Sequence, residues 1–307
     1  MSHEGSTKAI LAALFANLGI AITKFVAYLF SGAASMLAES VHSLADSANQ
    51  LLLILGGKRA KRAATEEHPF GYGRSRYVYA FIVSVVLFTV GGMFSLYEGI
   101  DKLNHPHELE NVWLPIAVLL IAIVLEGFSL RTAIRESRPF KGNQTWLQFI
   151  RRAKSPELPV VLLEDTAAQL GLIMALAGVG LSVITGNPIW DAFGTIAIGA
   201  LLMLVAVLLG VEMASLLIGE GGTQGEVESI KKALISAPGV ESVIHLKTLY
   251  LGPDELMLAA KIAIKANASG EEIAQSIDAA ELAVRQAVPA TRVIYLEPDI
   301  QRVSVSR

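Results

Sequence analysis

The sequence lacks cysteine and has few charged residues. None of its 307 residues is a cysteine, which excludes disulfide bonds and thiolate metal sites and leaves the redox compartment open. Charged residues make up 17%, and the formal net charge of -3 shows no basic excess of the kind that favours nucleic-acid binding. Hydrophobic residues make up 53%, and the mean hydropathy is +0.52. A soluble globular chain is rarely so apolar, so the composition indicates a membrane protein.

Long apolar segments recur over the first two thirds of the chain. A helix that crosses a bilayer needs about 20 mostly apolar residues. The sequence predicts six such helices, joined by short links that carry Gly, Pro or charge: residues 9–30, 35–55, 78–100, 113–134, 158–184 and 188–217. The first run continues past the length of a signal-peptide core without a small-residue cleavage site. We interpret it as the first membrane helix; a cleaved signal peptide is the alternative.

Lys and Arg residues gather in two of the links. The links between helices two and three and between helices four and five are rich in them, whereas the links on the other side hold only Lys102. Because short cytoplasmic loops are enriched in Lys and Arg, the two basic links are expected to be cytoplasmic. Both termini then lie on the cytoplasmic side as well.

The composition changes near residue 219. We therefore predict a transmembrane domain over residues 1–219 and a soluble domain over residues 220–307. From about Glu226 the hydrophobic pattern predicts a helix, two strands, a second helix that starts at SGEE, and a last strand. This αββαβ order suits a small two-layer α+β domain with two helices on one face of the sheet. At about 80 residues such a domain is only marginally stable alone, which favours dimerisation.

The stretch AESVHSLADSANQ, residues 38–50, places Glu39, His42 and Asp46 inside the second predicted membrane helix. An ionisable group at the bilayer centre costs at least about 2.5–3.5 kcal/mol, so it is expected to face the bundle interior and to have a partner. His42 and Asp46 are four residues apart, which puts them on one helix face, one turn apart. An imidazole and a carboxylate in this arrangement can fill two positions of a divalent-metal site. We interpret the pair as part of a cation site; a structural polar contact is the alternative.

Acids also occur near the same depth in two other predicted membrane helices. Glu164 and Asp165 are adjacent in LLEDTAA, so their side chains point about 100° apart and are not expected to face one site equally. Glu126 lies near the middle of the helix predicted over residues 113–134, where a lone carboxylate needs a cation or a proton. These acids extend the candidate cation site. An ion pair between Glu126 and Arg131 is the structural alternative for that residue.

SMLAESVHSLADSANQ on the second of six helices, followed by HPFGYGR at the start of the third, resembles the cation diffusion facilitator family. Asn17 and Lys24 in the first helix and the αββαβ soluble domain are similar too, so the resemblance covers nearly the whole chain. LLEDTAA and VEMASLLIGEG look most like the branch of mitochondrial zinc transporters and their bacterial relatives. The resemblance implies a homodimer of six-helix protomers with ferredoxin-like cytoplasmic domains, in a bacterial inner membrane, that exports a divalent metal in exchange for protons.

The family's usual H-x-x-x-D pair on the fifth helix is incomplete here. Asp165 matches the Asp, but Val161 stands at the position of the His. The resemblance therefore implies a site made by His42, Asp46 and Asp165 with one ligand missing. Glu126 or Glu164 could supply the missing ligand.

Glu126 is expected to approach the ion, directly or through one water, and Glu164 ranks second, as a shuttle or outer-shell group. One imidazole nitrogen with carboxylate oxygens is a borderline-hard ligand set. Zinc is the leading ion, while manganese, cobalt, nickel and iron(II) are less strongly excluded than by a site with two His. The expected partners are the metal ion, protons, lipid and a second copy of the chain, with no resident cofactor and no nucleic acid.

Other metal positions of the family have changed in this chain. A loop site of other members uses a His where Tyr72 stands, so His68 lacks its fellow ligand. In the soluble domain His245 and Glu297 keep ligand-like positions, but Tyr295 stands where a His is common. We interpret His245 as a plain strand residue and expect the soluble domain to need no metal.

The pattern and the resemblance together predict a divalent metal efflux transporter that works by proton-coupled alternating access. Metal ligands must be deprotonated, so binding displaces protons. The alternative is a non-transporting membrane metal sensor or scaffold that acts through its cytoplasmic domain. No nucleophile–base pair or dinucleotide fingerprint supports an enzyme.

Overall fold

The computed structural model describes residues 3–300, with side chains from residue 17 onward. Within that range the chain forms two compact units. The first holds residues up to 58 and residues 77–214, and the second holds residues 59–76 together with the chain from residue 215. The basic loop 59–76 thus belongs to the same unit as the C-terminal domain. The predicted division into 1–219 and 220–307 stays a prediction.

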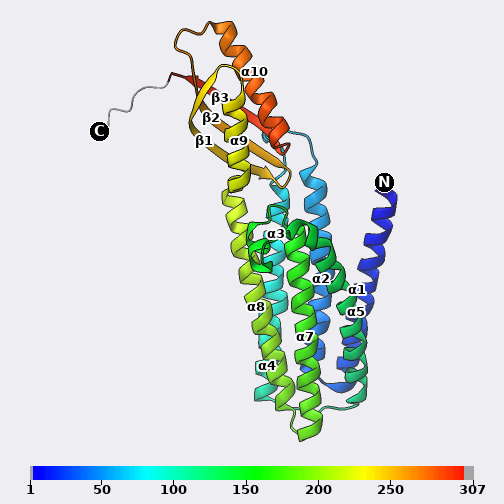
Figure 1. Cartoon of the computed structure of the whole chain (residues 1–307). Helices are drawn as coiled ribbons and strands as arrows, with labels where there is room; N and C mark the ends of the chain where they lie inside the picture. Colours follow the sequence, from blue (N-terminus) through cyan, green and yellow to red (C-terminus); the bar gives the residue numbers. More distant parts are fainter. Residues whose placement is uncertain (1–2, 301–307) are drawn as a thin grey trace, which may run out of the picture. The chain divides into compact units, whose positions relative to one another are not determined.

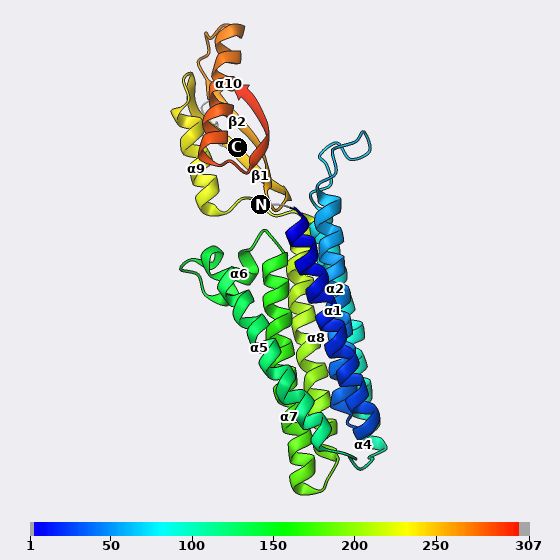
Figure 2. The same cartoon turned by 90° about the vertical axis from the view of Figure 1, so that its right-hand side faces the viewer.

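The first unit is a bundle of long helices (Figures 1 and 2). Its elements are α1 (His3–Ser31), α2 (Ala34–Ala60), α3 (Ser75–Val86), the π-helical η1 (Leu87–Met93), α4 (Phe94–Asn104), α5 (Trp113–Lys141), the short α6 (Trp146–Arg152), α7 (Glu157–Thr185) and α8 (Ile189–Ile218). The segments α3, η1 and α4 run on without a break. Each predicted membrane helix therefore corresponds to helical chain, with ends that differ by a few residues.

Among the residues that the structure describes, four helical segments are long and apolar enough to cross a membrane: Ser75–Asn104, Trp113–Lys141, Glu157–Thr185 and Ile189–Ile218. In α1 the described side chains include a shorter apolar stretch, Asn17–Ser31. α2 is less apolar because it carries the polar residues singled out above and a basic C-terminal end. The count of six membrane spans accordingly stays a prediction.

The largest difference from the predicted ends concerns α5, which continues to Lys141 instead of ending near residue 134. Proline inside a helix removes a backbone hydrogen bond, but Pro139 lies in the last turn, close to where the helix ends at Gly142. α2 likewise runs to Ala60 through two glycines. A Cβ at Gly56 would lie 2.8 Å from Tyr79 Cβ and 3.1 Å from Tyr79 Cγ, so this glycine lets α2 approach α3 closely.

Close packing of small residues joins α8 to the α3–η1–α4 segment. A Cβ at Gly92 would lie 2.5 Å from Met203 Cγ, and one at Gly199 would lie 2.7 Å from the Leu96 nitrogen. Interfaces between membrane helices use such residues because backbones can then approach directly. The π-helical turn falls at this contact, where an extra residue per turn changes the face that the segment presents.

The C-terminal part of the second unit has the predicted αββαβ order: α9 (Gln224–Ser236), β1 (Val240–Gly252), β2 (Glu255–Ile264), α10 (Gly270–Ala287) and β3 (Thr291–Asp299). The sheet order is β1-β2-β3, with β1 and β2 antiparallel and β2 and β3 parallel. Apolar residues of both helices and the sheet form one core, in which Ile230, Leu234, Leu258 and Val284 are fully buried. A two-layer α+β domain is confirmed.

Both helices of this domain begin with a capping box. Ser269 accepts a hydrogen bond from the Glu272 nitrogen at 3.3 Å, and Glu272 accepts one from the Ser269 nitrogen at 2.7 Å. Thr223 and Glu226 repeat the arrangement at α9. The Ser269 backbone hydrogen bond lowers the pKa of the Glu272 carboxyl. The predicted start of the second helix at SGEE is confirmed.

Candidate metal site

α2 carries the two residues at the centre of the candidate site. The His42 side chain is 1% exposed, and His42 Nδ1 lies 3.6 Å from Asp46 Oδ1, beyond hydrogen-bond distance. Within the described residues neither ring nitrogen of His42 has a hydrogen-bond partner, and Asp46 Oδ1 has none. A buried polar group left unpaired costs about 1–3 kcal/mol. A cation between the two side chains would satisfy both.

The adjacent acids of α7 face different neighbours. Glu164 is buried and accepts a hydrogen bond from Asn49 Nδ2 of α2 at 2.7 Å. Asp165 accepts one from Ser129 Oγ of α5 at 2.8 Å. Each acid thus has one hydrogen-bond partner, and Asp165 is the less buried of the two, which leaves it the more open to a further cation.

The candidate ligands interact through their charges although they come from three helices. The Asp46 carboxylate interacts electrostatically with Glu126 of α5 and Asp165 of α7, and His42 interacts with Glu126. In the part of the chain that the structure describes, no ion pair joins Glu126 to Arg131. The structure therefore brings His42, Asp46, Glu126 and Asp165 into one electrostatic neighbourhood.

This neighbourhood is not a closed coordination shell. Among the described residues no group of three or more His, Asp or Glu side chains lies close enough together to hold a metal ion. The five predicted ligands stay predictions, and a bound ion would need them to move closer together.

A buried ion pair lies beside the site, and the sequence-based reasoning did not identify it. Lys24 Nζ of α1 is 3.0 Å from Glu39 Oε2 and 2.8 Å from Ser43 Oγ, both of α2. The Lys24 and Glu39 side chains are 1% and 0% exposed. Both are charged residues of opposite sign inside predicted membrane helices, and that was the signal that could have paired them.

A second buried pair, also unforeseen, joins the ends of α2, α4 and α8. Asp191 is fully buried and accepts hydrogen bonds from the Ala34 nitrogen at 2.7 Å and from Ser35 Oγ. Lys102 Nζ lies 3.7 Å from Asp191 Oδ2 and donates to the carbonyl of Gly32. Gly32 has φ +63°, a value that favours glycine and allows the tight link between α1 and α2.

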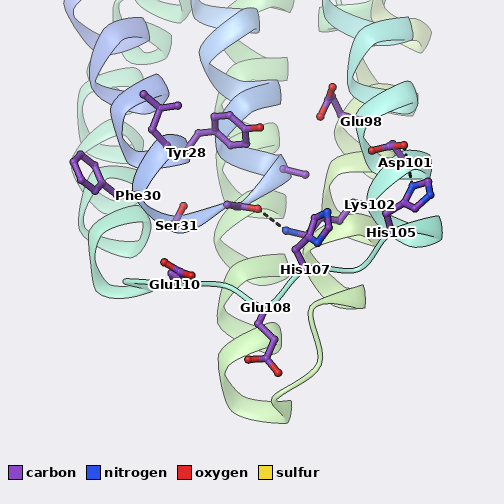
Figure 3. Close-up of a pocket in the computed structure, with 13 residues that line it drawn as sticks. Tyr28, Phe30, Ser31, Glu98, Asp101, Lys102, His105, His107, Glu108 and Glu110 are labelled. Carbon is purple, nitrogen blue, oxygen red and sulfur yellow. Dashed lines mark hydrogen bonds and ion pairs between the residues drawn. The ribbon is translucent and has the colours of Figure 1, made fainter.

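A cavity of about 430 Å³ opens at this same end of the bundle (Figure 3). Acidic and imidazole groups line it, among them Glu98, Asp101 and His105, and the last two lie 3.2 Å apart. It contains none of the five predicted ligands, so it is separate from the candidate site.

In the soluble domain a lysine lies between the two residues at ligand-like positions, His245 and Glu297. His245, Lys261 and Glu297 are paired in register across the three strands. Lys261 Nζ is 2.8 Å from Glu297 Oε1 and 3.3 Å from Asp299 Oδ2, and the hydrogen bonds that it donates to these carboxylates raise the pKa of Lys261. Tyr295 is 57% exposed. An ammonium group thus neutralises the carboxylates that a metal ion would need.

The loop position next to α3 is occupied by an aromatic pair. The rings of His68 and Tyr72 are 4.6 Å apart and meet edge to face, and Tyr72 Oη lies 3.3 Å from Thr65 Oγ1. This geometry is a packing contact, and the loss of the loop site stays a prediction.

Comparison with known proteins identifies relatives over most of the chain. The mouse protein "Proton-coupled zinc antiporter SLC30A9, mitochondrial" is 34% identical over 84% of this chain and 46% of its own length. "Metal tolerance protein C4" of Arabidopsis thaliana is 31% identical over 85% of this chain and 58% of its own. "Cation-efflux pump FieF" of Serratia proteamaculans is 28% identical over 76% and 72%. The chain spans about half the length of the mouse relative.

Two family models cover the two parts of the chain. The model described as "Cation efflux transmembrane domain" matches residues 10–218, and that described as "Cation efflux protein, cytoplasmic domain" matches residues 223–299. The match over 10–218 includes all five candidate ligands and the buried Lys24–Glu39 pair. The chain therefore belongs to the cation diffusion facilitator family of integral membrane cation efflux transporters, in the branch that contains SLC30A9.

Proposed function

We propose that this protein exports a divalent metal ion, with zinc as the leading ion, in exchange for protons. The observation that carries the proposal is His42, a buried imidazole to which no described residue hydrogen-bonds at either nitrogen, beside an oxygen of Asp46 that is equally unpaired among them. An unpaired polar side chain at this depth needs a cation or a proton as partner. The relatives named as a zinc antiporter and a cation-efflux pump support this reading.

The proposed ligands are His42, Asp46 and Asp165, with Glu126 in place of the missing His at Val161. Glu126 interacts electrostatically with both His42 and Asp165, and no hydrogen bond engages it among the described residues. Glu164 is held by Asn49 and is second, as an outer-shell or proton-carrying group.

Proton exchange follows from the chemistry of these ligands. An imidazole nitrogen and a carboxylate bind a metal ion only when they are deprotonated, so the metal and protons compete for the same atoms. When the site is open to the cytoplasm, a metal ion displaces protons from the ligands. When it is open to the other side, protons return and the ion leaves. The ligands come from α2, α5 and α7, so a relative shift of these helices changes the affinity.

Assembly and placement are part of the proposal. The cytoplasmic domain of about 80 residues is small for independent stability, which favours a homodimer. The basic links favour cytoplasmic termini. A bacterial inner membrane is the proposed location.

Transport by the purified protein in lipid vesicles tests the function. Vesicles are loaded with a metal-sensitive dye, and uptake of Zn²⁺, Mn²⁺, Co²⁺, Ni²⁺ and Fe²⁺ is measured with and without a pH gradient. We expect Zn²⁺ uptake that increases with an opposing proton gradient. Metal binding without uptake of any ion would instead support a sensor or scaffold.

A further inference from the structure

Lys24, which is paired with Glu39, places a positive charge beside the candidate metal site, and the proposed mechanism gives this charge no role. The pair joins α1 to α2, and Glu39 is one turn from His42 on α2. Glu39 is an acid on the helix that carries His42 and Asp46, yet its Oε2 atom accepts a hydrogen bond from Lys24. A carboxylate that binds an ammonium group cannot offer the same lone pairs to a metal ion.

The charge of Lys24 reaches the ligands themselves. Its ammonium interacts electrostatically with His42, Asp46 and Glu126. It is fixed in place because Ser43 Oγ accepts a second hydrogen bond from Nζ at 2.8 Å. A fixed positive charge so close to a cation site repels the bound ion, and burial strengthens this effect because water does not screen it.

The surroundings of Glu39 hold it in place from the other side. A Cβ at Gly171 of α7 would lie 2.6 Å from Glu39 Oε1, so any larger residue there would force this carboxylate to shift. Glu39 Oε1 is buried and has no hydrogen-bond partner among the described residues. The carboxylate is therefore confined beside the helix that bears Asp165, and removal of Lys24 would free its second oxygen, Oε2, as well.

We propose that Lys24 is an internal counter-cation that keeps Glu39 out of the metal's ligand set and limits the affinity of the site, so that the transported ion can be released. The proposal rests on the proposed transport function. Lys24 does not bind the metal; it acts through Glu39 and through its own charge. A transporter needs such a limit because an ion that is bound too tightly leaves slowly.

Three variants of the full-length protein in detergent test the proposal: Lys24→Met, Glu39→Gln and the double variant. Co²⁺ is the probe, because its visible absorption reports both binding and ligand geometry. Lys24→Met frees the Glu39 carboxylate, so we expect Co²⁺ binding about tenfold tighter, equivalent to about 1.4 kcal/mol. Glu39→Gln leaves the ammonium unpaired, so binding is expected to weaken about tenfold.

The double variant is the matched control. It removes both charges and keeps side chains of similar size, so its Co²⁺ affinity is expected to return to within about threefold of the wild type, the non-additivity that a coupled pair produces. The absorption spectrum of Lys24→Met should change as a carboxylate oxygen joins the ion, whereas that of the double variant should match the wild type. Size-exclusion profiles of all three variants verify folding.

The outcomes separate the two proposals. If the wild type binds no Co²⁺, the transport function itself fails. If the wild type binds and Lys24→Met has the same affinity and spectrum, the counter-cation role is wrong. If all variants weaken binding equally, the pair is structural and the proposal is overturned.

Discussion

The carboxylate of Asp191 at the start of α8 accepts a hydrogen bond from the backbone nitrogen of Ala34, the first residue of α2, at 2.7 Å. The first turn of a helix has backbone N–H groups without partners in the helix, and a carboxylate satisfies them. α2 is the helix that carries His42 and Asp46, so Asp191 fixes one end of the element on which the candidate site depends. Lys102 balances the charge of Asp191.

Replacing Asp191 by Asn should therefore destabilise the bundle. The change leaves Lys102 buried without its anion, and removal of one partner from a buried pair typically costs about 3–5 kcal/mol. Asp101→Asn is the control at the same end, because Asp101 is half exposed and pairs with the exposed His105; its effect should stay within about 0.5 kcal/mol. Denaturant titration of the detergent-solubilised protein measures the free energy of unfolding of both variants. Equal stability of the two would show that the Asp191 contacts do not stabilise the bundle.

The two acids proposed to replace the missing His are expected to affect Co²⁺ affinity to different extents. Glu126→Gln keeps the shape but removes a charge that no hydrogen bond fixes, so Co²⁺ affinity should fall about tenfold. Glu164→Gln keeps an acceptor for Asn49, and its effect should be smaller than about threefold. Titration with Co²⁺ compares them, and a larger loss in Glu164→Gln would reverse the ranking.

Glycine at position 171 should be required for packing between α2 and α7. A Cβ there would lie 2.6 Å from Glu39 Oε1, so Gly171→Ala should destabilise the protein by about 1–3 kcal/mol. Gly180 of the same helix has nothing within 4 Å of its added Cβ. Gly180→Ala should thus be neutral or stabilise by up to about 1 kcal/mol. The prediction is wrong if the melting temperatures of both variants shift in the same direction.

The ion pairs of Lys261 should make the stability of the soluble domain depend on pH at high pH. Hydrogen bonds that Lys261 donates to Glu297 and Asp299 raise the pKa of Lys261 above its usual 10.5. A raised folded-state pKa means that the ammonium adds stability below pH 10.5 and that this contribution is lost as the pH rises through the folded-state value. The melting temperature should drop more steeply above pH 10.5 in the wild type than in Lys261→Gln, measured in the full-length protein; parallel curves would argue against it.

Because an ammonium already neutralises these acids, Zn²⁺ should not raise the melting temperature of this domain.

Helix positions and the αββαβ order could be predicted from the sequence because they depend on local patterns. Ser269 and Glu272 illustrate this: their spacing alone indicates a capping box, and the structure has it. The end of α5 was harder to predict from the sequence. Pro139 lies in the last turn of the helix, and the sequence pattern did not distinguish this turn from a link. Tertiary packing sets such ends.

The candidate ligands could be predicted from the sequence for a different reason. An imidazole or carboxylate in an apolar helix is conspicuous, so His42, Asp46 and Glu126 could be named without a structure. Their partners could not be: Asp191 and Ala34 are 157 residues apart, and Asn49 and Glu164 are 115 apart. Such contacts follow from how helices pack, which periodicity does not encode.

Zn²⁺ uptake by vesicles that contain Asp46→Asn or Asp165→Asn tests the central claim most directly. Both variants keep the side-chain shape and remove a carboxylate charge from the candidate site, whereas Glu136→Gln changes an exposed carboxylate of α5 and serves as the control. The account predicts that Zn²⁺ uptake and the accompanying proton efflux are both lost in the two site variants and retained in Glu136→Gln. Uptake near the wild-type rate by either site variant, correctly folded and inserted, would contradict it.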